Sequence, residues 1–134
     1  MWPRIGGLRT LDLGTPGEMR HRLNALVLSG QKRATAGLLE HDYRAEGEEP
    51  EFAGERLVLI DNDDERVAEV VVEAVEIVPF GSVTWKFAQA EGEGCTSLAH
   101  WRAVHTGFWE NAGHKVADDT AVVCVRFRLA HPAE

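Results

Sequence analysis

A valine-rich run over residues 67–78, closed by Pro79, limits the fold of this chain more than any other feature. β-branched side chains favour strands, so the run predicts one long strand. Side chains alternate between the two faces of a strand, and one face would carry Ala68, Val70, Val72 and Ala74. Shorter apolar runs predict further strands at residues 36–39, 56–60 and 121–129.

Three helices are expected around these strands. The clearest covers residues 15–29, where Thr15, Pro16 and Glu18 fit the start of a helix with a capping box. Its apolar stripe consists of Met19, Leu23, Leu26 and Val27. A short helix is expected at 82–90, and a longer one from Thr96 or Ser97 to Ala112. Alternating βαβ units are absent, so the pattern favours an α+β fold with a mixed, mostly antiparallel sheet that curls on itself.

The organisation expected is one domain. The chain has 134 residues, with a core expected over about 15–129. Residues 41–53 are polar and acidic, which predicts an exposed loop. No run approaches the roughly 20 apolar residues that span a bilayer, and the N-terminus lacks the apolar stretch of a secretory signal. We therefore expect a cytoplasmic protein without a membrane partner.

Charge is distributed unevenly along the chain. The net charge is −8, which by itself disfavours a nucleic-acid partner because phosphate contacts need lysine and arginine. Residues 40–76 hold 14 acidic and three basic residues, a balance of −11. Residues 1–39 hold six basic and two acidic residues, a balance of +4. A locally positive N-terminal region is therefore compatible with the acidic total.

The loop Gly30-Gln31-Lys32-Arg33-Ala34-Thr35 is the best candidate for chemistry. A lysine here can bind an anion, and if it is partly buried its pKa falls and it can act as a base. The hydroxyl of Thr35 offers a nucleophile or a hydrogen-bond donor. The spacing alone is common, and a solvated turn explains it equally well.

Two other groups carry the same ambiguity. Glu91 and Glu93 alternate with glycines, which allow a ligand to approach the backbone, yet two exposed carboxylates near a helix start need no ligand. A tryptophan that lies off the apolar helix stripe could stack on a base, and the sequence leaves open which one does so. His105 lies on that stripe and is interpreted as a core residue. The histidines and cysteines lack metal-binding spacing, so no metal and no cofactor are expected.

Together these segments resemble the ASCH domain family, a branch of the PUA-like folds. The matching positions are residues 29–35 (SGQKRAT), 79–80, 87–94 (FAQAEGEG), 97–98, 101–102, 105 and 108–109. The resemblance implies a small β-barrel with flanking helices and a cleft that binds RNA or a modified nucleoside. Some members resemble amidohydrolases that remove the acetyl group from N-acetylated cytidine with a lysine, a threonine and a glutamate.

Carried over residue by residue, the implied catalytic set is Lys32, Thr35 and Glu93, with Glu91 as the competing carboxylate. Lys32 would take the proton of Thr35, whose oxygen attacks the amide, and Glu93 would protonate the leaving amine. Backbone N–H groups near Gly30 or at 92–94 would hold the oxyanion. The expected substrate-binding residues are Gly30, Arg33, Glu91, Arg102 and Trp85.

The family is functionally mixed, so other readings stay open. One is metal-free cleavage of RNA, in which Lys32 and Arg33 stabilise the phosphorane and Glu93 acts as base. Another is a non-catalytic RNA-binding module, whose affinity would fall steeply with salt. The oligomeric state expected is a monomer or a homodimer.

Overall fold

The computed structural model describes residues 1–131, which form one mixed sheet with three α-helices. The strands are β1 (Arg4–Ile5), β2 (Leu8–Leu11), β3 (Ala34–Leu38), β4 (Arg56–Ile60), β5 (Arg66–Pro79) and β6 (Ala121–Leu129). The α-helices are α1 (Glu18–Leu28), α2 (Trp85–Glu91) and α3 (Leu98–Asn111). Short helical turns lie at Leu39–Tyr43 (η1, a π-helix), Arg44–Glu46 (η2) and Phe80–Ser82 (η3).

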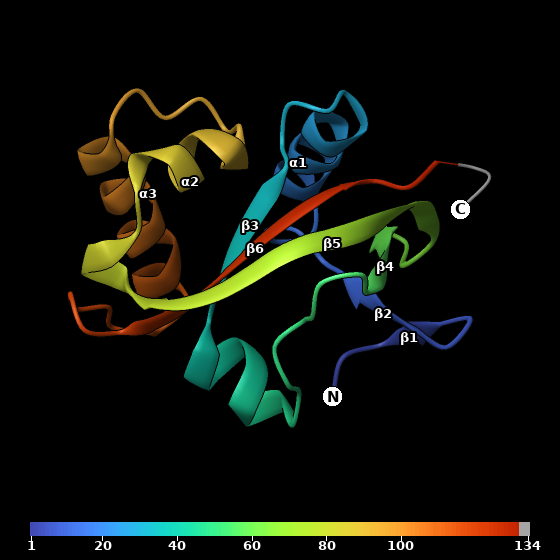
Figure 1. Cartoon of the computed structure of the whole chain (residues 1–134), viewed down its shortest axis with the longest axis horizontal. Helices are drawn as coiled ribbons and strands as arrows, with labels where there is room; N and C mark the ends of the chain where they lie inside the picture. The colour runs from blue at the N-terminus through green and yellow to red at the C-terminus, as the bar shows by residue number, and fades with distance from the viewer. Residues whose placement is uncertain (132–134) are drawn as a thin grey trace.

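The sheet order is β1-β2-β4-β5-β6-β3, and only the β2–β4 pairing is parallel. Within the described residues no pairing joins β1 to β3, so the sheet is open and does not close into the barrel expected. The α+β class and the mostly antiparallel pairing are confirmed. Figure 1 shows β5 and β6 crossing the molecule, with α2 and α3 at one end and β1, β2 and β4 at the other.

A bulge in β5 changes the faces that alternation predicts. Val72 pairs with Phe127 and Ala74 pairs with Arg126, so Glu73 is the extra residue. Val70 and Val72 lie in the core as expected, but beyond the bulge Val75 takes the place expected for Ala74. An inserted residue reverses the alternation of all residues after it.

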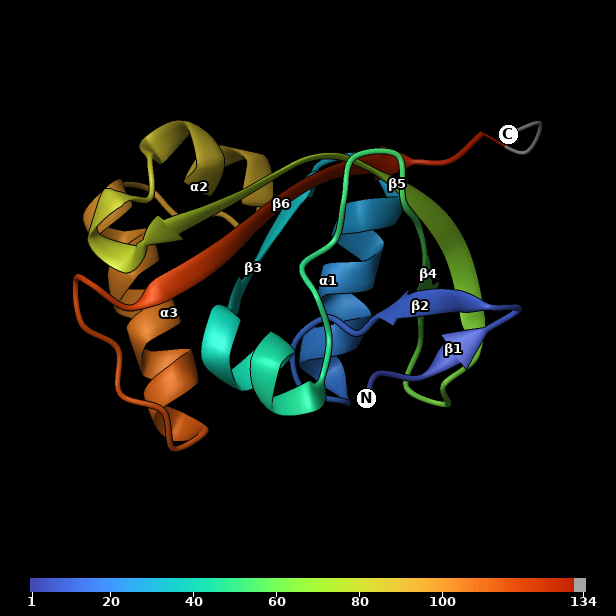
Figure 2. The same ribbon diagram turned by 60° about the horizontal axis from the view of Figure 1, so that its bottom comes forward.

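Two hydrophobic clusters form the core. Where β3 pairs with β6, they lie on opposite faces of the sheet. The first joins α1 to the sheet, with Leu23 and Val27 from the predicted stripe. The second joins α2 and α3 to the sheet and contains Trp101 and Trp109. The rotated view in Figure 2 shows α1 enclosed by the strands at one end of the molecule, while α2 and α3 lie together at the other end.

Several element boundaries differ from those predicted. The first helix begins at Glu18, and the capping box is absent because Gly17 occupies the N-cap with no side-chain cap. The Gly17 N–H donates instead to Oδ1 of Asn62 at 2.7 Å, and the Asn62 amide donates back to the Gly17 carbonyl at 3.0 Å. Strand β3 begins at Ala34, so Thr35 lies in a strand and not in a loop.

The N-terminal and acidic segments carry more structure than the sequence indicated. Strands β1 and β2 were not expected, yet Leu11 and Leu13 belong to the first core cluster. The segment 41–53, expected to be an exposed loop, buries Tyr43 and Glu51, which share a 2.8 Å hydrogen bond. None of the helices in the described part of the chain is long and apolar enough to cross a bilayer.

Candidate active site

Two chain turns bring the GQKRAT segment against the acidic glycine segment. Gly30, two residues after the end of helix α1, has a φ of +82°, and Gly92, directly after the end of helix α2, has a φ of +66°. The Arg33 N–H donates to the carbonyl of Ala90 at 2.7 Å, and the Gln31 side chain donates to the carbonyl of Gly92 at 2.9 Å. These contacts hold together residues about 60 positions apart in the sequence.

Glycine is required at position 92 for a second reason. A Cβ on Gly92 would lie 2.1 Å from the carbonyl oxygen of Gln31 and 3.0 Å from the Cα of Lys32. Both contacts are with backbone, which cannot move aside as a flexible side chain can. The glycine therefore lets the two turns approach closely enough to place Lys32 beside the carboxylates.

Lys32 is buried, and its ammonium is surrounded by acceptors. Nζ lies 2.6 Å from Oε2 of Glu93, 2.7 Å from the carbonyl of Ala34 and 3.0 Å from Oε2 of Glu91. An ammonium has three protons, so these three acceptors use all of them. Both candidate carboxylates, Glu91 and Glu93, thus contact Lys32, so its contacts do not choose between them.

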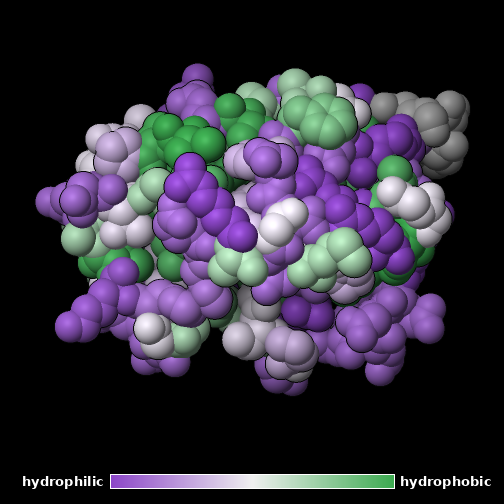
Figure 3. All heavy atoms as spheres, turned by 90° about the horizontal axis from the view of Figure 1, so that it is seen from below, coloured by the Kyte–Doolittle hydropathy of each residue, from purple (hydrophilic) through white to green (hydrophobic). Residues whose placement is uncertain are grey.

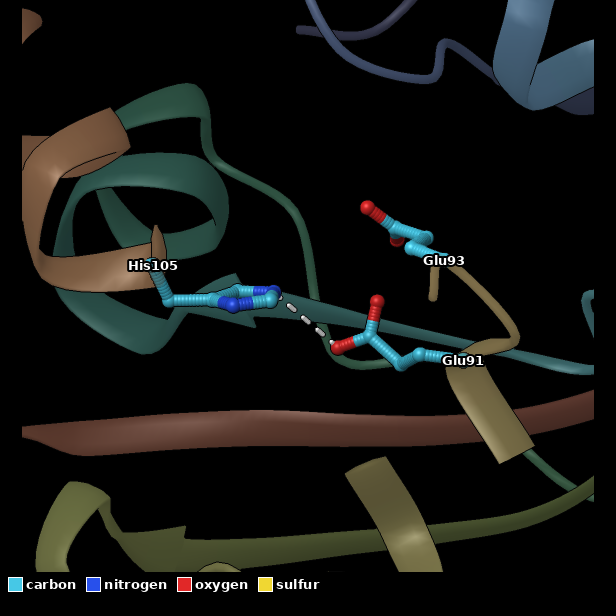
Figure 4. Close-up of side chains that lie close together, drawn as sticks. All are labelled: Glu91, Glu93 and His105. Carbon is cyan, nitrogen blue, oxygen red and sulfur yellow. Dashed lines mark ion pairs between the residues drawn. The ribbon is translucent and has the colours of Figure 1, made fainter. Parts of the chain in front are cut away.

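Glu91 is the more enclosed carboxylate of the pair. Its side chain is 2% exposed, against 15% for Glu93. Its Oε1 lies 3.2 Å from the indole nitrogen of Trp101 and 3.2 Å from Nε2 of His105. Figure 4 shows Glu91 between His105 and Glu93, with the dashed line marking its ion pair with His105. Glu91 therefore links α3 to Lys32, while Glu93 keeps an accessible edge.

The charge state of Lys32 differs from the expectation. Burial lowers the pKa of this lysine, as the sequence analysis supposed, but the charges of Glu91 and Glu93 outweigh burial and raise the pKa above its ordinary value. This direction favours the ammonium form of Lys32 and runs against the fall in pKa that a base at this position needs.

The two carboxylates differ in their affinity for protons. Burial raises the pKa of Glu93, and the neighbouring charge of Glu91 adds to this effect against the opposing charge of Lys32. Burial also acts on Glu91, but Lys32 and His105 together bring its pKa well below the usual range. Of the two carboxylates, Glu93 is therefore the one that takes up a proton more readily.

Thr35 lines the same cavity as Lys32, Glu91, Glu93 and His105. This inner cavity has a volume of about 70 Å³ and adjoins a larger cleft of about 360 Å³. The two spaces share the lining residues Leu13, Gly14, Thr35, Ala36, Phe108 and Trp109. A ligand in the cleft would thus present its end to a hydroxyl and a carboxyl group at once.

Glu91, Glu93 and His105 bring their ligand atoms within 4.8 Å of one another, the spacing of a metal donor set. The ammonium of Lys32 already bridges the two carboxylates of this set, and its charge disfavours a metal ion there. We therefore assign these side chains to an ion-pair network and do not assign them as metal ligands.

The remaining predicted residues lie outside the inner cavity. Gly30 and Arg33 are exposed and line neither of the two joined spaces. Arg102 donates to the carbonyl of Gly81 at 2.7 Å, and Trp85 packs against the second core cluster. Neither lines the joined spaces, so the contacts described support structural roles for them. The expected backbone donors at Gly30 and Gly92 are also engaged, with the carbonyls of Val27 and Gln89.

His105 is the residue of the site that the sequence reasoning did not assign. It was interpreted as a core residue because it shares a helix stripe with Trp101, four positions earlier. The structure confirms its burial, but one ring nitrogen faces Glu91 across the cavity wall. A polar residue on an apolar stripe, one turn from a tryptophan, is the signal that could have identified it.

Comparison with known proteins identifies related structures. Protein EF3133 from Enterococcus faecalis, of the family DUF984, is 32% identical with a TM-score of 0.77, and the alignment covers 88% of this chain and 73% of that chain. An ASCH domain from Lactobacillus crispatus is 28% identical with a TM-score of 0.69, covering 81% and 70% respectively. The hypothetical protein PH0355 is 17% identical with a TM-score of 0.55, over 79% of this chain and 89% of that one, and supports the fold alone.

A search among curated proteins finds no match to this chain. The ASCH domain family matches residues 10–131, which include the end of β2, every strand from β3 onward, all three α-helices and the charged residues of the site. With this coverage, the chain belongs to the ASCH domain family.

Proposed function

We propose that this protein is a nucleoside-directed hydrolase that removes the acetyl group from cytidine acetylated on its exocyclic amine. Membership of the ASCH family indicates an RNA-related function, which is the class to which this substrate belongs. The observation that carries the proposal is the 2.6 Å contact between Lys32 and Glu93, in a cavity that Thr35 also lines. A hydroxyl and a proton-exchanging carboxyl group are the parts that amide cleavage needs.

The pKa directions change the mechanism inferred from the sequence. In the revised mechanism, Glu93 accepts the Thr35 proton while the Thr35 oxygen attacks the acetyl carbonyl. Glu93 then returns that proton to the leaving amine, and cytidine departs. Water, deprotonated by Glu93, next attacks the acetyl-threonine ester, releasing acetate and restoring the hydroxyl. Lys32 is not the base here, because its ammonium holds Glu93 in place.

The charge of the cleft supports a free nucleoside over an RNA strand. The lining of the larger space includes Asp12, Asp42, Glu46 and Glu51, and no lysine or arginine in the described part of the chain lines it. Figure 3 shows that the face seen from below, which carries η1 and η2, is largely hydrophilic. Such a lining repels phosphate. This observation disfavours both the ribonuclease and the RNA-binding module as alternatives.

The test is to incubate the purified protein with the acetylated cytidine and to follow cytidine and acetate by chromatography. We expect turnover by the wild type and a loss of about 10²–10⁴-fold in Thr35→Ala and Glu93→Gln, the usual range for a positioned acid or base. Thr106→Ala is the matched control, because this threonine lies on α3 and does not line the cavity. Full turnover by Thr35→Ala would disprove the assignment.

A parallel incubation distinguishes the alternative activities. Labelled single-stranded RNA is incubated with the protein and a chelator, and we expect the RNA to stay intact. Cleavage that survives the chelator would favour the metal-free ribonuclease. RNA binding without cleavage, with an affinity that falls steeply with salt, would favour the binding module.

A further inference from the structure

The ring of His105 is placed between two hydrogen-bond acceptors. Nδ1 lies 2.9 Å from the backbone carbonyl of Trp101, and Nε2 lies 3.2 Å from Oε1 of Glu91. A neutral imidazole has one N–H and one bare nitrogen, so it can satisfy only one of these partners. An imidazolium donates to both. With Glu91 ionised, the geometry therefore calls for a doubly protonated ring.

Aromatic contacts restrict the rotation of the His105 ring, so it cannot readily reach other hydrogen-bond partners. It stacks on Trp101 with centroids 4.0 Å apart and planes at 23°, and its edge meets Trp109 at 5.5 Å. His105 is 9% exposed, so a rotation that gave Nε2 to water would break these aromatic contacts. The indole N–H of Trp101 also donates to the Oε1 that faces His105. The tryptophan thus fixes both the ring and its carboxylate partner.

When Glu91 and Glu93 are both ionised, the charges of the site balance if His105 is protonated. Glu91 and Glu93 carry two negative charges when ionised, and Lys32 supplies one positive charge. The titratable groups facing the His105 ring are Glu91 at the end of α2 and Glu93 just after it, with Lys32 behind Glu91. On its own helix the contact is the Trp101 carbonyl. In that state, with Glu93 ready to act as a base, a neutral His105 would leave one carboxylate uncompensated in an enclosed site, which is costly.

We propose that His105 is a positioning residue, which holds a second buried positive charge against Glu91 and thereby keeps Glu93 free to act as the base. Glu91 is saturated by Lys32, Trp101 and His105, so it remains ionised and leaves proton exchange to Glu93. The direction of the His105 pKa agrees, because Glu91 raises it against the lowering effect of burial. The catalytic part of this inference rests on the proposed function, but the protonation state of His105 does not.

The first experiment requires no enzyme activity. The imidazole nitrogens of ¹⁵N-labelled protein are followed by NMR as the pH is raised, in the wild type and in Glu91→Gln. We expect both His105 nitrogens to carry protons at neutral pH in the wild type, and one of them to be lost in Glu91→Gln. A singly protonated His105 at neutral pH in the wild type would overturn the inference. Because this measurement uses the unaltered protein, it holds even if a His105 variant fails to fold.

The second experiment reads the effect on Glu93 through the pH dependence of kcat/KM for the acetylated cytidine. Removing a nearby positive charge raises the pKa of a carboxyl group, so the acid limb in His105→Gln should move to higher pH by about one unit. His100→Gln is the matched control, since His100 is exposed on the same helix and outside the cavity. Equal loss of activity at every pH, with an unmoved limb, would show a merely structural role and overturn the proposal.

The two experiments separate this inference from the proposed function. No turnover by the wild type, together with a doubly protonated His105, would refute the hydrolase while upholding the charged ring. Turnover by the wild type with a neutral His105 would refute the inference alone.

Discussion

A buried ammonium is stable only where acceptors replace the water it has lost, and Lys32 meets this condition with three of them. The same contacts also serve the carboxylates, which would otherwise repel each other in an enclosed site. Lys32 therefore acts on Glu91 and Glu93 mainly by fixing their positions and charge. Its importance for activity and its importance for stability should be separable by experiment.

We predict that Lys32→Met destabilises the protein by about 3–5 kcal/mol, the usual cost of removing one partner from a buried ion pair. The physical reason is that two enclosed carboxylates lose their counter-charge. Urea unfolding at neutral pH measures the change, with Lys86→Met as control because Lys86 is exposed on α2. A loss no larger than that of the control would contradict the role of Lys32 as an anchor.

The motif predicted which residues matter but not their charge state. The sequence singled out Lys32, Thr35 and the two glutamates, and all four line one cavity. The expectation that burial would lower the pKa of Lys32 left out its two carboxylate partners, which lie 59 and 61 positions away and raise that pKa. Spacing along a chain does not reveal how many charges meet in space, and that number sets the direction of a pKa shift.

At the scale of elements, the site depends on how helix α2 ends. Gly92 combines a left-handed backbone with a close approach to the Gln31 carbonyl. We predict that Gly92→Ala destabilises the protein by more than the roughly 1–2 kcal/mol that a left-handed conformation alone costs an L-residue. The additional loss comes from separating the two turns, so activity should fall with stability. Thermal unfolding and the deacetylation assay measure the two effects.

Gly94→Ala is the matched control for this prediction. Gly94 also has a positive φ, +88°, but a Cβ there would meet nothing within 4 Å. It therefore reports the backbone cost without the clash. If both variants lost equal stability and kept equal activity, the close approach at Gly92 would have no functional weight.

Elements defined by their own residues were predictable, and those defined by distant partners were not. Strands β4 and β6 have the predicted bounds, because continuous apolar runs specify them. The short strand β2 was missed because its pairing with β4, about 48 residues later, holds it in place. The start of α1 was mispredicted for the same reason, since the N-cap is Gly17, which pairs with Asn62, 45 residues later. The bulge at Glu73 is likewise set by pairing with β6.

At the scale of the whole molecule, ion pairs tie the N-terminal strands to the acidic segment. Arg4 contacts Glu48 at 2.6 Å, and Arg9 lies 3.6 Å from the same carboxylate and 2.6 Å from Glu55, just beyond the segment. These links explain why a segment with so many carboxylates is ordered against the sheet: its charges are neutralised by arginines from β1 and β2. They also place one wall of the large cleft, because Glu51 and Tyr43 belong to the same segment.

The free energy of unfolding should fall as the pH is lowered, because the stabilising contribution of Glu48 depends on its ionised form. Hydrogen bonding to Arg4 is the main reason why the pKa of Glu48 falls to about 2 in the folded protein. A carboxyl group with a lowered pKa contributes stability above its unfolded pKa, and the contribution is lost as the pH falls through the folded value. We therefore predict that Glu48→Gln is less stable than the wild type near neutral pH, and that the difference shrinks between about pH 4.5 and about pH 2. Urea unfolding over this range measures it, with the exposed Glu49→Gln as control. A difference that stays constant with pH would mean that the lost contact is one of packing, and that charge does not hold the acidic segment to the N-terminal strands.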